Sequence, residues 1–212
     1  MITQEIMQGS DLASVIRRSR DLADEVDHGR AAAYRLLAKL LLAAPNDELL
    51  SQLAAHEGDS SPMGRVQAGL AAAAARTNAV AVEREFWALF IGVGRGELLP
   101  YASYYLTGFL HERPLARVRA DLAALGIARA DAASEPEDHL GVLCDVMAGL
   151  ADGSLARDGD AAHRFFTTHL APWSARFFAD LAAAKSASFY RAVAAFGIAF
   201  IDIETEGFAL PA

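Results

Sequence analysis

An acidic residue beside a histidine is the most chemically suggestive pair in this sequence. Asp138 and His139 follow Glu135 and Glu137 in the run SEPEDHL, where Pro136 restricts the backbone. A carboxylate next to an imidazole is suited to holding a cationic or hydrogen-bonding ligand. The structural alternative is a buried, hydrogen-bonded histidine, with the carboxylates of a first helical turn interacting with the helix dipole. The residues by themselves leave both interpretations open.

A second stretch of chemical character runs over residues 83–105, EREFWALFIGVGRGELLPYASYY. An apolar stripe at helical spacing predicts a helix over residues 80–93, and Trp87 widens the stripe beyond what an amphipathic helix needs. Glycines end this helix, and Pro100 fixes the backbone where an aromatic cluster begins. The stretch is either a buried helix with its loop or one wall of a groove for an apolar peptide.

Other chemistry lacks the residues that it requires. The sequence has no G-x-x-x-x-G-K-[ST] phosphate loop, and its glycine-rich run follows a predicted helix, not a strand. Cys144 is the single cysteine, and the six histidines are not spaced as metal ligands. No serine lies in a nucleophile motif. We therefore expect no catalytic residues, no metal and no cofactor.

The elements that position these stretches are predicted to be helices. The chain has 212 residues, of which 53% are hydrophobic, so a large core is available. Alanine abounds, and β-branched residues do not alternate over the length of a strand. The sequence therefore predicts an all-α globular bundle of about ten helices.

Charge and hydropathy limit the partners. A net charge of -8 repels phosphate backbones, so we expect no nucleic acid partner. No apolar run approaches the ~20 residues of a membrane helix, so membrane insertion is not expected. The run IRRSR at residues 16–20 is followed by acidic residues where an export signal needs an apolar segment. We expect a cytoplasmic protein.

The helices group into two halves after an N-terminal segment. Residues 1–28 are predicted to form a polar helix or arm, residues 29–128 one helical half, residues 129–134 a linker, and residues 135–212 a second half. In the arm, a thin apolar stripe is spaced as on one helix face: Leu12, Val15, Ile16, Leu22 and Val26. The second half is expected to begin with a helix over residues 135–150, with Ser134 and Glu137 as a capping box.

Four segments, taken together, resemble the TorD/DmsD family of redox-enzyme maturation chaperones. They follow in the family's order between about Arg30 and Phe200: EFWALF at 85–90, LPYASYY at 99–105, EPEDHL at 135–140 and FTTHLAPW at 166–173. The resemblance implies an all-helical, two-part, cytoplasmic protein without catalytic activity.

The resemblance also implies a function and a partner. Such chaperones bind the twin-arginine signal peptide of a molybdoenzyme catalytic subunit in its apo form. They hold this peptide back from export until the molybdenum cofactor is inserted into the enzyme. Reductases of dimethyl sulfoxide, trimethylamine N-oxide or nitrate, and formate dehydrogenases, all remain open as clients. The oligomeric state is open as well: the protein can be a monomer or a dimer. In a domain-swapped dimer, the linker is where the two subunits would exchange helices.

The family's signal-peptide-binding positions carry over to residues of this sequence. Those implied for the groove are Trp87, Leu89, Phe90, Pro100, Tyr101, Ser103, Tyr104, Glu135, Pro136, Asp138 and His139. Asp138, with Glu135 or Glu97, is the hypothesis for the end that receives the arginines. Ala102 departs from the family, since an acidic residue is more usual in this turn.

A transcriptional regulator resembling TetR is the alternative of a different class, because such regulators are also all-α and of this size. It would need a basic helix-turn-helix near the N-terminus. Arg17, Arg18 and Arg20 are basic, but acidic residues follow them directly.

Overall fold

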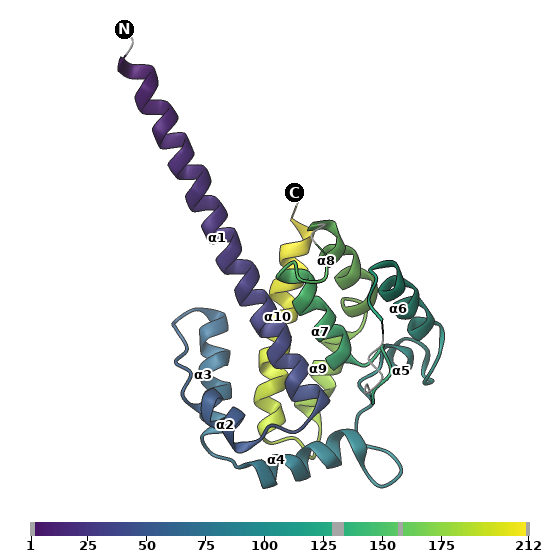
Figure 1. Ribbon diagram of the computed structural model, residues 1–212. Helices are drawn as coiled ribbons and strands as arrows, with labels where there is room; N and C mark the ends of the chain where they lie inside the picture. The colour runs from purple at the N-terminus through teal and green to yellow at the C-terminus, as the bar shows by residue number, and fades with distance from the viewer. Residues whose placement is uncertain (1–2, 129–133, 157–158, 211–212) are drawn as a thin grey trace.

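The computed structural model describes residues 3–128, 134–156 and 159–210, without the side chains of residues 3–17, 19–23 and 159. Within these ranges it contains ten α-helices and two π-helical segments, and no strand longer than an isolated bridge (Figure 1). The predicted all-α fold is confirmed. In order, the elements are α1 (Thr3–Leu42), α2 (Asp47–Ala54), α3 (Pro62–Ala74), α4 (Ala79–Phe86), η1 (Trp87–Ile91), α5 (Ala102–Thr107), α6 (Arg113–Ala124), α7 (Leu140–Ala151), α8 (Gly159–Phe165), η2 (Phe166–Leu170), α9 (Ser174–Ala183) and α10 (Phe189–Ala209).

The first helix is longer than the sequence predicted. We expected a boundary near Gly29, but α1 continues through it. A glycine costs a helix only about 1 kcal/mol relative to alanine, and the apolar residues that follow Gly29 offset this by packing. Ala31, Tyr34 and Leu37 are buried, whereas the part of α1 before them extends away from the other helices (Figure 1).

One hydrophobic core lies between α1, α7, α9 and α10. Almost every residue of α7 is buried, since this helix is surrounded by others. Helices from both predicted halves share the core: α1 packs on α7, and α3 packs on α10. The linker predicted at residues 129–134 lies, apart from Ser134, outside the described residues.

A buried ionic cluster ties α1 to the end of α10. The Glu204 carboxylate accepts hydrogen bonds from Arg30 Nε at 2.7 Å, from Arg30 Nη2 at 2.9 Å and from the Tyr34 hydroxyl at 2.8 Å. The bond to Glu204 raises the pKa of Arg30, so the guanidinium stays charged. The cluster holds α1 at the point where it leaves the globule.

Carboxylates distant in sequence satisfy helix ends that local caps do not. Asn46 caps α2 locally, since its side chain accepts a hydrogen bond from Leu49 N–H. The start of α10 has no side-chain cap from Ser188. There, the Glu85 carboxylate accepts hydrogen bonds from the backbone N–H groups of Ser188, Phe189 and Tyr190, at 2.7–3.0 Å. Because these N–H groups have no partner within their helix, Glu85 both stabilises α10 and joins it to α4.

Candidate functional site

Two of the segments identified in the sequence meet in space. Residues 100–102 run antiparallel to residues 138–140, and Tyr101 forms a β-bridge with His139. Two backbone hydrogen bonds flank the bridge, one from Ala102 N–H to the Asp138 carbonyl at 2.9 Å and one from Leu140 N–H to the Pro100 carbonyl at 2.8 Å. The aromatic turn and the acid–histidine run therefore form one unit.

Asp138 lies inside this unit and not at its surface. Its side chain is almost fully buried, with 1% of the residue exposed, and its carboxylate accepts a hydrogen bond from Ser103 N–H at 2.9 Å. This N–H belongs to the first turn of α5, where a carboxylate is a favourable cap. Ser103 is also buried, and its Oγ accepts a hydrogen bond from Glu112 N–H at 3.2 Å. Asp138 and Ser103 hold the turn in place, whereas the sequence had suggested Asp138 as a residue that receives the arginines of a peptide.

His139 caps the following helix. Its Nδ1 accepts a hydrogen bond from Gly141 N–H at 3.0 Å, so in the neutral ring the proton sits on Nε2. Burial lowers the pKa of His139 to about 4, partly opposed by the nearby Glu135 and Asp138 carboxylates. His139 is therefore neutral at pH 7, because an imidazolium would lose its hydration here.

The predicted capping box does not form. The helix begins at Leu140, because His139 has an extended backbone where it pairs with Tyr101. Glu137, expected to cap the helix, instead accepts a hydrogen bond from Arg119 Nε of α6 at 3.0 Å. A local sequence motif has here been overridden by a tertiary pairing.

The accessible side of the unit carries Glu135, Tyr101 and Pro136, all half-buried. The Tyr101 hydroxyl donates to Glu135 Oε2 at 2.6 Å, and the Tyr101 ring lies edge-on to the His139 ring with centroids 5.1 Å apart. Burial and the Glu135 carboxylate raise the pKa of Tyr101, so the hydroxyl remains a donor. Glu137 and Asp138 are buried, which leaves Glu135 as the carboxylate of this run that a ligand can reach.

The predicted apolar wall divides between the core and the surface. Leu89 and Phe90 are buried, and Phe90 packs against the rings of Phe177 and Tyr190. Trp87, at the start of η1, keeps 48% of its surface exposed. Leu89 and Phe90 thus support the fold, while Trp87 is available to a partner.

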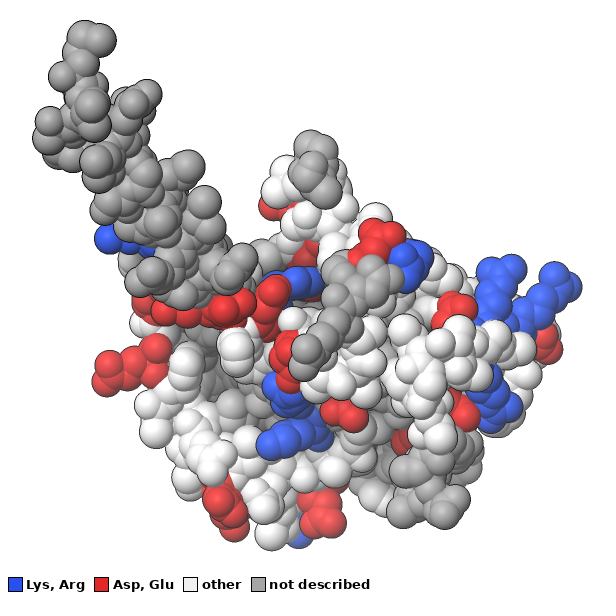
Figure 2. All heavy atoms as spheres, turned by 45° about the horizontal axis from the view of Figure 1, so that its top comes forward, with Lys and Arg blue, Asp and Glu red and all other residues white. Residues whose placement is uncertain are grey.

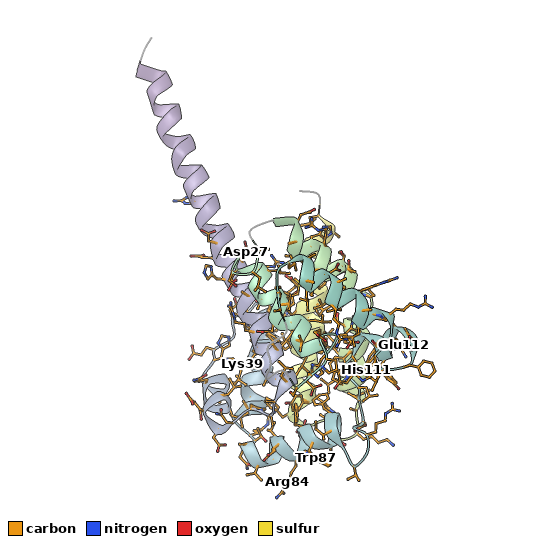
Figure 3. All side chains as sticks on the ribbon, turned by 45° about the vertical axis from the view of Figure 1, so that its right-hand side comes forward. Asp27, Lys39, Arg84, Trp87, His111 and Glu112 are labelled. Atoms are coloured by element: carbon orange, nitrogen blue, oxygen red, sulfur yellow. The ribbon has the colours of Figure 1, made fainter. Side chains whose placement is uncertain are left out.

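Trp87 lies at the lower edge of the molecule in Figure 3. The residues that follow it pair with the segment that leads into the aromatic turn, because Glu97 N–H donates to the Ala88 carbonyl at 3.1 Å and Leu98 N–H to the Leu89 carbonyl at 2.8 Å.

A pocket of about 360 Å³ opens between α5 and the glycine-rich loop that follows η1, residues 92–97. Tyr104 lines it and accepts a hydrogen bond from Arg95 at 2.7 Å. Glu97, expected near the arginine end, bonds instead to the N–H groups of Lys185 and Ser186, which lower the pKa of its carboxyl. Sequence reasoning missed Arg95, because an arginine in a glycine-rich loop carries no periodic signal.

Comparison with known proteins identifies the family. Residues 23–179 match the family described as nitrate reductase delta subunit. The chain belongs to this family. The resemblance to TorD/DmsD maturation chaperones is thereby confirmed, and the TetR-like alternative is not favoured.

Proteins similar in sequence to this chain include named chaperones. The chaperone protein TorD of Vibrio cholerae is 32% identical over 127 residues, which cover 56% of this chain and 58% of TorD. The chaperone protein YcdY of Escherichia coli is 32% identical over 113 residues, covering 53% and 57%. The chain thus spans less than two thirds of either relative. A crystal structure from Archaeoglobus fulgidus, described as a redox enzyme maturation protein, has the same fold, with a TM-score of 0.52, 19% identity and coverage of 83% and 93%.

Two further properties concern the described residues only. None of their helices is long and apolar enough to cross a membrane. Among the same residues, no group of three or more histidine, cysteine, aspartate or glutamate side chains lies close enough together to hold a metal ion.

Proposed function

We propose that this protein is a cytoplasmic, non-catalytic chaperone that binds the twin-arginine signal peptide of an apo molybdoenzyme and keeps it from export until the molybdenum cofactor is inserted. The proposal rests on membership of the nitrate reductase delta subunit family and on relatives named as chaperones. The observation that carries it to particular residues is the accessible Glu135–Tyr101 pair at the joined segments.

Glu135 has the chemistry that an arginine requires. Tyr101 occupies one carboxylate oxygen, and Oε1 accepts no hydrogen bond from the described residues. A guanidinium would form charge-assisted hydrogen bonds with this oxygen. The half-buried Tyr101 ring would cover the arginine stem, in the way that aromatic faces receive cations. We therefore assign the arginine end to Glu135, with Asp138 as the residue that positions the turn.

Trp87 supplies an apolar contact for the rest of the peptide. A signal peptide continues from its arginines into an apolar, helix-forming stretch, and exposed aromatic rings are common anchors for such segments. Ile91, on the same π-helical turn, is 45% exposed and extends this surface.

Calorimetric titration with twin-arginine signal peptides from molybdoenzymes of the same genome tests the proposal. We expect saturable binding to one peptide, which would identify the client, and weaker binding of its Lys-Lys variant. Glu135→Gln should weaken binding chiefly at low salt, because salt screens the charge interaction. Glu83→Gln, an exposed charge change on α4, is the matched control. If the folded protein binds none of the peptides, the proposed function is wrong; if Glu135→Gln and Glu83→Gln behave alike, only the assignment of Glu135 fails.

A further inference from the structure

The N-terminal part of α1 is a helix that extends beyond the globule. Figure 1 shows it leaving the other helices, and Val26, near its base, is 60% exposed. We call residues 3–29 of α1 the arm. The match to the nitrate reductase delta subunit family begins at residue 23, so most of the arm precedes it. Because most helices in proteins gain their stability by packing against another element, the arm is suited to a partner helix.

The arm sequence carries the pattern of a coiled coil. Leu12, Val15, Ser19, Leu22 and Val26 are separated alternately by three and four residues. This is the spacing of the a and d positions of a heptad, which face a partner helix. Ser19 is the one polar residue among these five positions. A single polar residue in such a seam lowers the stability of a coiled coil and helps to define its register. The pattern therefore favours another helix of similar sequence as the occupant.

The charges of the arm decide its orientation. Arg17, Arg18 and Arg20 form a basic block, and Asp21, Asp24, Glu25 and Asp27 form an acidic block directly after it. Figure 2 shows acidic side chains gathered where the arm joins the globule. Two parallel arms would place like charges together, whereas two antiparallel arms place each basic block beside an acidic one.

We propose that the arm pairs with the arm of a second copy as a two-stranded antiparallel coiled coil. In the register that aligns the seams, Val15 lies beside Val26 of the second copy, and Ser19 beside Leu22. Arg18 and Glu25 then both occupy g positions, which flank the seam, and Arg18 faces Glu25 of the second copy. The two-fold symmetry repeats each contact. Arg18 and Glu25 are both exposed in the single chain, so a second copy can reach them.

Charge reversal in the full chain, followed by sedimentation over a wide concentration range, tests this pairing. Arg18→Glu and Glu25→Arg should each weaken the dimer roughly tenfold or more, because each replaces two attractive pairs by two repulsive ones. A mixture of the two variants should form the dimer again, since both cross-pairs are then attractive. Arg20→Glu and Asp21→Arg make the same charge changes at positions away from the seam and should have smaller effects. A protein that is monomeric at every concentration, or a mixture that stays monomeric, would overturn the proposal.

Cysteine cross-linking tests the orientation separately. Val15→Cys mixed with Val26→Cys should form a disulfide between the two variants, whereas neither variant should cross-link with itself. Cys144 is fully buried and burial raises its pKa, so the native thiol should contribute little. Self-cross-linking of Val15→Cys without the mixed product would indicate parallel arms and reject the antiparallel register. Circular dichroism of each variant checks that the globule remains folded.

Discussion

The Asp138 carboxylate and the Ser103 N–H are joined by a hydrogen bond of 2.9 Å across 35 residues of sequence. The same two segments are paired through their backbones, so this bond closes a small hydrogen-bonded unit. The unit is buried, and its outer side presents Tyr101 and Glu135. Asp138 therefore holds its neighbours Tyr101 and Glu135 in position, and in the proposed function it would act on the peptide only through them.

Replacing Asp138 should destabilise the protein. Asp138→Ala removes the cap of α5 and leaves the Ser103 N–H unpaired in a buried place, which should cost about 1–2 kcal/mol in the free energy of unfolding. Asp145→Ala, an exposed aspartate of α7, should change it by no more than about 0.5 kcal/mol. Urea unfolding of both variants measures the difference. Equal stabilities would show that the Asp138–Ser103 bond does not hold the turn.

The stability of the protein should fall below pH 6.5 because of His139. Its pKa is about 4 in the folded protein and 6.5 when unperturbed, so between these values the unfolded state binds the additional proton. The stabilisation is complete above pH 6.5 and is lost as the pH falls towards 4. The loss should be on the order of 2–3 kcal/mol.

A non-titrating variant isolates this contribution. His139→Asn can still cap α7 but cannot take up a proton, so its stability should depend less steeply on pH over the same range. Burial also lowers the pKa of His169, and this second contribution is common to both proteins. Urea unfolding at several pH values gives the two curves. If they run parallel, His139 is not the titrating group.

The sequence predicted those parts of the structure that depend on nearby residues. The helical fold follows from composition and periodicity, and Asn46 is recognisable as a cap because a cap acts within one turn. The same kind of reasoning failed at Ser134 and Glu137, because residues 138–140 pair with residues 100–102 and the helix begins only at Leu140. A local motif contains no information about a competing partner that is distant in sequence.

The candidate site was predicted as a set of residues but not as a surface. The resemblance to the TorD/DmsD family brought forward Tyr101, Glu135 and Asp138, which do meet in space. Asp138 is the buried support, and Tyr101 and Glu135 are the accessible pair. This division depends on which side chains form hydrogen bonds with backbone N–H groups. Asp138 does so and Glu135 does not, and two acids in one short run give no sign of this difference.

Glu85 should contribute more to stability than its surface position suggests. Glu85→Ala leaves three backbone N–H groups at the start of α10 without their acceptor. Because loss of a single cap costs about 0.5–2 kcal/mol, we expect a loss near 2 kcal/mol or above. Glu83→Ala, an exposed neighbour on α4, should have little effect. Urea unfolding measures the free energy of unfolding of both variants. Similar free energies would show that water replaces the Glu85 carboxylate with no loss of stability.

Trp87 and Phe90 should separate binding from folding. Trp87→Ala removes a ring that is about half exposed, so it should cost less free energy of unfolding than the loss of a buried ring. In the proposed function, it should weaken signal-peptide binding by about 2 kcal/mol, the value of an aromatic anchor. Phe90→Ala should instead destabilise the fold by about 3–5 kcal/mol, because it leaves a cavity among buried rings.

Fluorescence provides a direct readout for the same pair of roles. The second tryptophan, Trp173, is buried, so a change in emission on adding the peptide should come from Trp87. Trp87→Phe should abolish this change while leaving the buried emission intact. If the wild-type emission is unaffected by a peptide that calorimetry shows to bind, the peptide does not reach Trp87, and the apolar contact must lie elsewhere on the surface.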